Sequence, residues 1–296
     1  MQKLSKQALI GYPAGIITGI TYGLNPLFAM PLMGDGASIE AILFFRYGLS
    51  VLLLGLFILL TKQTFRVTLK QVGILFILGL LYTASSLFLF EAYKYIPSGL
   101  ATTLIFLYPV LVALIMVFLR VVPSWPVWVS IVATFAGVVI MTQGSGTEAI
   151  NPIGVWLSLG SALVYALFIV IINKSKTISS VSSTVLTFYS LMVGSAVFMT
   201  KILMSDIDMM TGLNNSMAWF NLVGLALFPT IVSTASLALS SRNIGATKAS
   251  VLGVFEPITA ILVGTLFLGE ALTTNIVVGI VISIVAVTFM IVSTKR

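Results

Sequence analysis

The amino-acid sequence predicts an all-α polytopic membrane protein with ten transmembrane helices, arranged as two inverted five-helix repeats. Three observations lead to this prediction: an apolar composition, a division of charges between alternate loops, and an internal repeat. Of the 296 residues, 59% are hydrophobic and 8% are charged, and the mean hydropathy is +1.15. A soluble domain of this size needs far more polar surface, so the solvent of this chain is lipid.

Ten apolar stretches follow one another along the chain, and each is long enough to cross a hydrocarbon core about 30 Å thick. They are residues 8–30, 38–60, 71–93, 97–119, 124–142, 151–172, 178–200, 217–240, 246–268 and 273–293. The first stretch begins near Lys3 and Lys6, as a signal peptide would. It is longer than a signal peptide's apolar core and has no clear cleavage site, so we interpret it as a retained helix.

Charged residues divide between alternate loops, and this division orients the chain. Both termini and every second loop carry only basic charges: Lys3, Lys6, Lys62, Arg66, Lys70, Arg120, Lys174, Lys176, Arg242, Lys248, Lys295 and Arg296. The acids Asp35, Glu40, Glu91, Glu148, Asp206, Asp208 and Glu270 fall on the other side. Basic loops stay in the cytoplasm, so we predict the cytoplasmic (inner) membrane with both termini inside. A nucleic-acid partner is not expected, because no basic and aromatic stripe lies outside the membrane.

The chain repeats itself at a constant offset of 148 residues. Residues 92–119 align without gaps on 240–267, which places Pro109 on Pro257 and Tyr108 on Glu256. The predicted repeats are residues 1–145 and 146–296. Each contains five crossings, an odd number, so the second must be inverted relative to the first. Inverted repeats are typical of transporters that expose one central site alternately to either side.

Sequence motifs in both halves resemble those of a known family. In the second half they are Phe255–Thr259 (FEPIT), Leu268–Thr273 (LGEALT) and Gly279; in the first they are Ala92–Pro97 (AYKYIP) and Tyr108–Pro109. These motifs resemble the EamA-type members of the drug/metabolite transporter superfamily, and the resemblance covers the whole chain. It implies transport of amino acids and their relatives, other metabolites or drugs. One departure is Val122, which stands where the first repeat of the family usually carries a glutamate.

The side-chain chemistry of the chain excludes several classes of site. It has no cysteine and no histidine, which removes thiol nucleophiles, histidine acid–base catalysis, and thiolate or imidazole metal sites. It also has no Gly-rich loop ending in Lys-Ser or Lys-Thr, so ATP is not the direct energy source. We expect no enzyme activity, no cofactor and no metal. The expected partners are a small-molecule substrate and the bilayer.

Two formal charges lie well inside the predicted hydrocarbon, where each is costly unless paired or hydrated. Glu256 lies about 12 Å below the cytoplasmic end of the ninth span, at roughly 1.5 Å per residue. Pro257 cannot donate its backbone N–H and should loosen the helix near Gly253. The functional hypothesis is that Glu256 binds a substrate amino group or takes up a proton. The structural alternative is a protonated acid hydrogen-bonded to a neighbouring helix.

Arg46 is the second buried charge, about 8 Å below the outer boundary at roughly 1.5 Å per residue. Its side chain would either snorkel outward to Glu40 or Glu91, or point into a cavity and bind a substrate carboxylate through two hydrogen bonds. In the second case Arg46 and Glu256 would bracket a zwitterion such as an amino acid.

The first span carries a regular stripe of glycines and a proline break. Small residues at Gly11, Gly15, Gly19 and Gly23 favour close helix packing over a substrate groove. Asn25 and Pro26 follow in the upper third of the helix, where the Asn25 amide would bond either freed carbonyls or substrate. Tyr22 lies near the same face as Asn25.

Tyrosines inside the predicted spans are further candidates for the site. Tyr82, Tyr108, Tyr165 and Tyr189 lie away from the helix ends, and a phenol at that depth needs a hydrogen-bond partner, which a wet cavity provides. The predicted substrate-binding residues are Glu256, Arg46, Tyr108, Asn25, Tyr22, Tyr82 and Tyr165. The predicted hinge residues are Pro26, Pro109, Pro257 and Gly253.

The functional prediction is a secondary transporter that exports or exchanges small metabolites, amino acids or related amphipathic compounds first among them, by alternating access. Helices one, three, four, six, eight and nine would line the cavity, and helices five and ten would buttress them. One alternative is an uncoupled facilitator or channel; an intramembrane enzyme acting on lipid-linked substrates is disfavoured by the missing catalytic residues. The short loops would permit a homodimer without requiring one.

Overall fold

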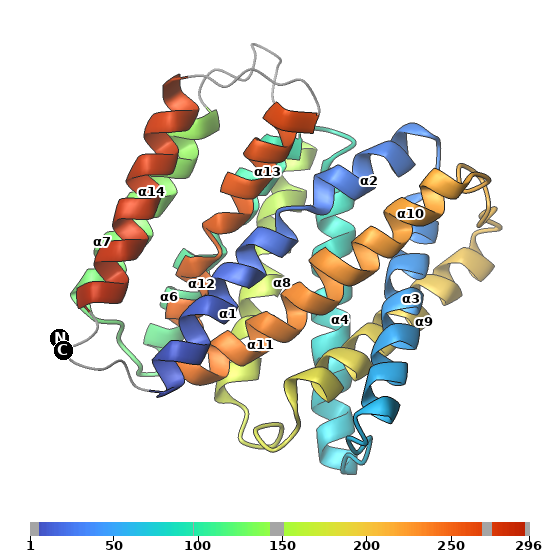
Figure 1. Cartoon of the computed structure of the whole chain (residues 1–296), viewed down its shortest axis with the longest axis horizontal. Coiled ribbons are helices and arrows are strands. Elements are labelled where there is room, and N and C mark those ends of the chain that lie inside the picture. The colour runs from blue at the N-terminus through green and yellow to red at the C-terminus, as the bar shows by residue number, and fades with distance from the viewer. Residues whose placement is uncertain (1–5, 97, 143–150, 268–273, 294–296) are drawn as a thin grey trace.

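The computed structural model describes residues 6–96, 98–142, 151–267 and 274–293, and the regular structure within these ranges is helical (Figure 1). Several predicted features lie outside the described residues: Lys3, Pro97, Glu148, Lys295, Arg296 and the segment 268–273 with Glu270. The predicted division between residues 145 and 146 also lies outside them and stays a prediction.

The described helices form ten rods, one for each predicted span. In the first half they are α1–α2 (Lys6–Tyr22 and Asn25–Gly34), α3 (Ile39–Leu60), α4 (Leu69–Ala92), α5–α6 (Ser98–Ile105 and Tyr108–Phe118) and α7 (Trp125–Thr142). In the second half they are α8 (Pro152–Lys174), α9 (Ser183–Met204), α10–η1–α11 (Ser216–Leu225, Ala226–Val232 and Ser233–Ile244), α12–α13 (Ala246–Leu252 and Phe255–Phe267) and α14 (Thr274–Ser293). The predicted ten-helix fold is confirmed.

Polar side chains define where several of the rods begin. Ser38, Thr68, Asn151, Ser182 and Asn215 stand just before α3, α4, α8, α9 and α10, and each side chain accepts a hydrogen bond from a backbone N–H of the first turn. Such caps satisfy donors that have no partner within the helix. The capping residue of each of these helices follows the preceding helix after only a short loop.

Four of the rods are interrupted. The rods α5–α6 and α12–α13 break within one residue of equivalent positions. Their first turns contain Pro109 and Pro257, which are related by the repeat offset, and α6 begins at Tyr108 and α13 at Phe255. The rod α1–α2 breaks before Asn25 and Pro26. The rod α10–α11 does not break but widens into the π-helix η1, which contains Pro229. Proline explains each interruption, because it removes a backbone donor.

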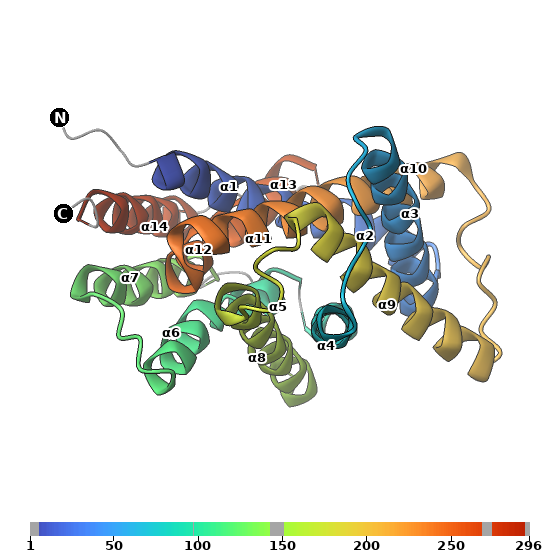
Figure 2. The same ribbon diagram turned by 90° about the horizontal axis from the view of Figure 1, so that it is seen from below.

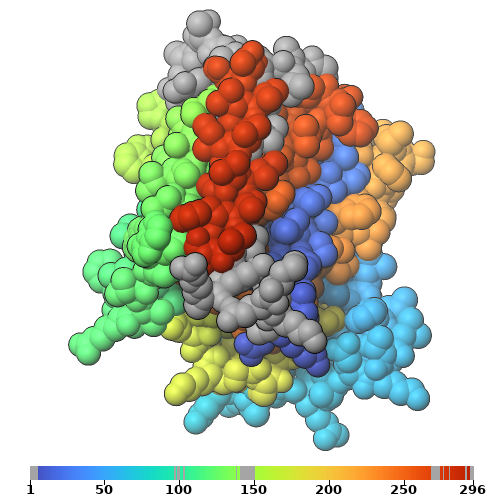
Figure 3. Space-filling view, turned by 60° about the vertical axis from the view of Figure 1, so that its left-hand side comes forward, coloured from blue at the N-terminus to red at the C-terminus, as the bar shows by residue number. Residues whose placement is uncertain are grey.

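The two halves are related by pseudo-two-fold symmetry: when equivalent rods are exchanged, the largest contacts between rods map onto one another. The rods α7 and α14 pack on each other, as do α3 and α9, and each pair is its own equivalent under the exchange. The contact of α1 with α11 corresponds to the contact of α8 with α4. In Figures 1 and 3, α7 and α14, the fifth and tenth rods, lie side by side at one edge of the molecule.

The ends of the rods form two faces. The start of α1 and the end of α14 lie at the same face (Figure 1), which we call the terminal face. At the opposite face two of the described acids form ion pairs: Glu40 with Lys201 at 2.7 Å, and Glu91 with Lys94 at 3.0 Å. Seen at right angles in Figure 2, α4 and α8 lie on one side of the molecule and α1 on the other.

Candidate substrate-binding site

Glu256 is buried at the break between α12 and α13. It is the second residue of α13 and only 3% exposed. Among the residues that the structure describes, none forms an ion pair or a hydrogen bond with its carboxylate. The structural alternative, a hydrogen bond to a neighbouring helix, is therefore not found there. An unpaired buried acid needs a proton or a ligand.

The glycine stripe of α1 brings backbone directly against this break. A Cβ atom on Gly19 would lie 2.8 Å from Cβ of Phe255 and 3.1 Å from the backbone nitrogen of Glu256. A Cβ atom on Gly23 would lie 2.5 Å from the carbonyl oxygen of Glu256. Gly11 and Gly15 make similarly close approaches to α11 and α12. The packing interpretation of the stripe is confirmed, and it fixes the backbone that carries Glu256.

Three of the predicted tyrosines form one cluster beside Glu256. The ring of Tyr165 on α8 stacks on Tyr22 of α1 at 5.9 Å between centroids and meets Tyr108 of α6 edge-on at 5.0 Å. Tyr22 directly precedes Gly23, which packs on the Glu256 carbonyl, and Tyr108 packs on Gly253 in the break before Glu256. Four rods from both halves thus contribute to one polar site.

The two broken rods meet where Tyr108 lies against Gly253. A Cβ atom added to Gly253 would fall 1.5 Å from the Tyr108 hydroxyl oxygen and 2.8 Å from its Cζ atom. The carbonyl of Gly253, which Pro257 leaves without its usual donor, accepts from the backbone N–H of Glu256 at 2.8 Å. The predicted hinge residue Gly253 therefore lies at the contact between the two breaks.

We expect Gly253→Ala to lower the free energy of unfolding by about 1–3 kcal/mol, the usual cost of overpacking a buried site. The double variant Gly253→Ala/Tyr108→Phe should recover part of the loss, because it removes the closest clash and leaves the Tyr108 Cζ atom and the Ser250 carbonyl oxygen 2.8 and 2.9 Å from the new Cβ atom. Thermal unfolding in detergent measures both, with Gly73→Ala as the control, since nothing lies within 4 Å of a Cβ atom there. Equal losses in the single and double variants would contradict the contact.

Asn25 uses one end of its amide to repair the proline break. Pro26 cannot donate to the carbonyl of Tyr22, and the Asn25 Nδ2 group donates to that carbonyl instead, at 3.0 Å. The side chain is buried, and its Oδ1 atom has no hydrogen-bond partner in the described part of the chain. Buried acceptors are rarely left unsatisfied, so this oxygen is available to a ligand.

Arg46 does not reach outward. Its side chain is 1% exposed, and Glu40 and Glu91 are paired with lysines, so the snorkelling alternative is wrong. The guanidinium instead contacts the π-helix: Nε donates to Thr230 Oγ1 at 2.5 Å and Nη2 to the carbonyl of Pro229 at 3.2 Å. It also lies over the rings of Tyr47 and Phe90, 5.7 and 5.8 Å from their centroids.

A row of aromatic rings runs from the Tyr108 cluster to Arg46. Tyr165 stacks on Phe168, Phe168 packs on Tyr82, and Tyr82 packs on Tyr47, with centroids 5.4 to 6.2 Å apart. Tyr82 also shares a 3.1 Å hydrogen bond with Thr234 of α11. Glu256 and Arg46 thus lie near opposite ends of the row and do not pair with each other.

Tyr189, the fourth mid-span tyrosine, lies elsewhere. Its hydroxyl donates to the carbonyl of Phe65 at 2.8 Å, in the loop between α3 and α4. That bond satisfies the phenol without a cavity, so the expectation that Tyr189 faces the site is wrong.

Sequence reasoning missed the polar residues of the π-helix and its surroundings. Thr230, Ser233, Thr234 and Ser50 are all buried and lie near Arg46 or Tyr82. One signal for them was present: Pro229 stands in the middle of an apolar span and is followed at once by a threonine.

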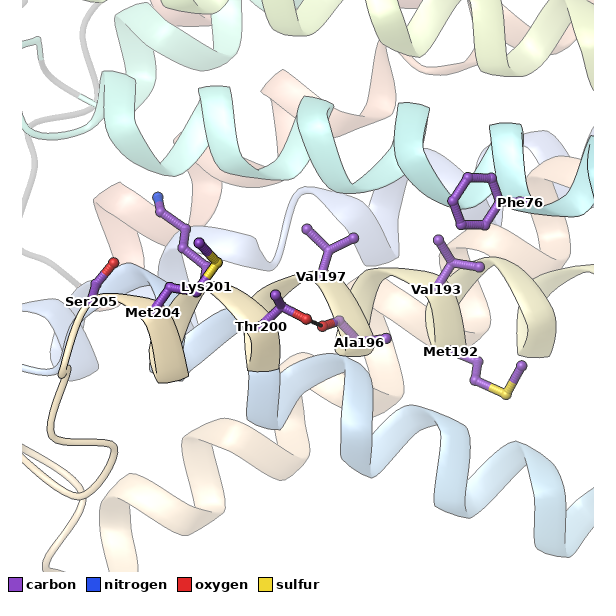
Figure 4. Close-up of a pocket in the computed structure, with 9 residues that line it drawn as sticks. All are labelled: Phe76, Met192, Val193, Ala196, Val197, Thr200, Lys201, Met204 and Ser205. Atoms are coloured by element: carbon purple, nitrogen blue, oxygen red, sulfur yellow. Dashed lines mark hydrogen bonds between the residues drawn. The ribbon is translucent and has the colours of Figure 1, made fainter.

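The open grooves near α9 belong to the periphery of the molecule. One groove of about 580 Å³ lies between α4 and α9 and is lined mainly by apolar side chains, with Lys201 near one end (Figure 4). A second, of about 670 Å³, lies on the α3 side and shares Met192 and Ala196 with the first. Neither includes the residues around Glu256. Within the described residues, no three Asp or Glu side chains gather as metal ligands would.

The family of the chain follows from comparison with known proteins. Residues 9–143 and 152–292 each match the model of the EamA-like transporter family. The chain belongs to this family. It is therefore a multi-pass membrane transporter of the drug/metabolite transporter superfamily and not an enzyme, and its two halves are repeats.

Two further proteins are similar to this EamA-like chain. An "Uncharacterized transporter" of Archaeoglobus fulgidus is 28% identical over 126 residues, which are 43% of this chain and 43% of that protein. The match thus spans less than half of the relative's length. A solved structure titled "Crystal structure of protein" covers 97% of this chain and 99% of its own, with a TM-score of 0.76 and 17% identity. That likeness supports the fold alone.

Proposed function

We propose that this transporter exports or exchanges small metabolites that carry an amino group, amino acids and related amphipathic compounds first among them, by alternating access across the cytoplasmic membrane. The observation that carries the proposal is Glu256, a buried acid without a partner among the described residues, set at a helix break. A carboxylate in that position binds a substrate ammonium group or a proton on each cycle.

The surroundings of Glu256 suit an ammonium group. Tyr22, Tyr108 and Tyr165 present aromatic rings beside the acid, and aromatic faces attract cations when water is excluded. Asn25 adds a buried amide oxygen without a partner in the described chain. Arg46 lies farther along the aromatic row and would receive the substrate carboxylate in a separate step, because the two charged groups of one α-amino acid are too close together to reach Glu256 and Arg46 at once.

The breaks in α5–α6 and α12–α13 provide the movement. Both occur at prolines, and they meet at Gly253 and Tyr108. Rocking of one half against the other would bend these rods and expose the site to one face at a time. Pro26, Pro109 and Pro257 are the hinges of this motion.

Uptake into proteoliposomes tests the function. Labelled amino acids should accumulate against their concentration when a pH gradient is imposed, and the matched N-acetyl amino acids should not, because they lack the ammonium group. Simple equilibration that is indifferent to the gradient would instead favour the uncoupled facilitator. Equal uptake of free and acetylated compounds would contradict recognition through Glu256.

The chain has no cysteine, so in a single-cysteine variant only the introduced thiol can react with a maleimide. Such variants therefore test the predicted orientation. Lys174→Cys, near the terminal face, should react with a membrane-impermeant maleimide only in inverted vesicles. Asp208→Cys, in the loop after α9, should react in intact cells. The reverse pattern would place both termini outside and would contradict the predicted orientation.

A further inference from the structure

The rod α10–η1–α11 contains a π-helical segment that its own backbone hydrogen bonds do not fully stabilise. The segment runs from Ala226 to Val232 and includes Pro229. Pro229 has no backbone N–H to donate to the carbonyl of Leu225, and a π-turn leaves further carbonyls poorly bonded. Side-chain donors must therefore bond these backbone carbonyls, because water is absent from the hydrocarbon core.

Thr230 of η1 and two side chains of α3 supply these bonds. The Thr230 hydroxyl donates to the carbonyl of Leu225 at 2.7 Å, and Arg46 Nε donates to the Thr230 oxygen at 2.5 Å. Arg46 Nη2 reaches the carbonyl of Pro229, and Ser50 Oγ lies 3.1 Å from the carbonyl of Ala226. Arg46 and Ser50 stand four residues apart on one face of α3. Thr230, Arg46 and Ser50 thus support the widened turn together.

The other half of the molecule shows what the same packing looks like without an arginine. There α9 lies against α4, and the two helices approach through Gly79 and Gly194. A Cβ atom on Gly79 would lie 2.8 Å from the carbonyl of Ser190. The helix α4 is continuous from Leu69 to Ala92. Arginine support and the π-helix therefore occur together, in one half only.

The π-helix sets the orientation of the residues that follow it. One extra residue in a turn rotates the rest of the helix by about 100°. Thr234 meets the Tyr82 hydroxyl at 3.1 Å, and the carbonyl of Ser233 lies 3.4 Å from Thr18 Oγ1. Rewinding η1 into a regular α-helix would turn both residues away from these partners, on the side of the rod that borders the aromatic row.

The acceptors that hold Arg46 are neutral and bind one N–H each. A carboxylate offers a guanidinium two parallel, charge-assisted hydrogen bonds, which are stronger than bonds to a hydroxyl or a carbonyl. We propose that Arg46 is a positioning residue: its guanidinium holds the π-helix, and a substrate carboxylate draws it away, which frees the α10–α11 rod to bend. The second step rests on the proposed transport of amino acids.

Hydrogen exchange in residues 225–235, followed by mass spectrometry, tests the holding step without substrate. Arg46→Gln should raise exchange there at least about tenfold, since each lost hydrogen bond is worth roughly 1 kcal/mol. Thr230→Val, which keeps the side-chain volume, should do the same if Arg46→Gln fails to fold. Arg66→Gln, in an exposed loop, is the matched control and should have no effect. Unchanged exchange in both site variants would overturn the inference while leaving the proposed function intact.

The second step is tested with a matched pair of compounds, an amino acid and the amine formed by its decarboxylation. In the wild-type protein the amino acid should raise exchange in residues 225–235, and the amine should not. Thr230→Val should lower the KM of the amino acid and also its kcat, while the KM of the amine stays unchanged. A purely structural role for Arg46 predicts equal effects on both compounds, and that result would overturn the switch. If the protein transports neither the amino acid nor the amine, the proposed function is refuted. The holding step is still tested by hydrogen exchange in the Arg46→Gln and Thr230→Val variants.

Discussion

Glu256→Gln is expected to remove gradient-driven accumulation, with a fall of about 10- to 150-fold in the initial rate. Glutamine keeps the shape of the side chain but can neither bind an ammonium group by charge nor carry a proton. Loss of one hydrogen-bonded charge from a buried site is worth about 1.5–3 kcal/mol, which corresponds to a fall of this order. The measurement is uptake into proteoliposomes under an imposed pH gradient.

The same variant should remain folded, and this separates a transport role from a structural one. No described residue bonds the Glu256 carboxylate, so glutamine removes no contact of the fold, and the cost of a buried acid disappears. We expect the midpoint of thermal unfolding to stay the same or to rise. Glu91→Gln, the same chemical change in an ion pair with Lys94, should affect neither property. Unfolding of Glu256→Gln, or full activity in it, would refute the assigned role.

Much of the fold was accessible from the sequence because lipid imposes simple rules. Length and hydropathy locate the ten rods, and the prolines at 109 and 257 place breaks that the structure confirms. The glycine stripe could be interpreted correctly as well, since four glycines at four-residue spacing form one bare face. These features depend on one helix at a time, or on a repeat that is visible in the chain.

The site was harder to predict because its residues come together only through packing between rods. The sequence offered two orientations for Arg46 and no means of choosing, since its partners Thr230 and Pro229 are more than 180 residues away in the chain. The repeat aligned Tyr108 with Glu256, but the contact of Tyr108 with Gly253 follows from how the two broken rods cross. Tyr189 was misassigned because the loop carbonyl that satisfies it cannot be located without the fold.

Gly23→Ala is expected to cause the largest loss of stability of any single methyl addition along the first rod, about 3 kcal/mol or more. The new Cβ atom would lie 2.5 Å from the carbonyl oxygen of Glu256 and 2.6 Å from Cβ of Thr259. The carbonyl oxygen of Glu256 belongs to the backbone and cannot rotate away, so the α1–α2 rod must separate from α13. At Gly15 the closest atom is Cδ1 of Leu252, at 2.3 Å, and a flexible side chain can move.

This difference makes the prediction specific. Leu252→Ala should rescue Gly15→Ala only in part, because it removes the closest clashing atom but leaves Ser240 Oγ 2.9 Å from the new methyl group and empties a buried site. Thr259→Ala should not rescue Gly23→Ala, because the clash with the Glu256 carbonyl remains. Gly34→Ala is the control on the same rod, with nothing within 4 Å of the new methyl group, and it should be neutral. Thermal unfolding in detergent ranks the five variants. If Gly23→Ala proves as stable as Gly34→Ala, then α1 is not packed against the backbone of Glu256, and the rigid support proposed for the site is absent.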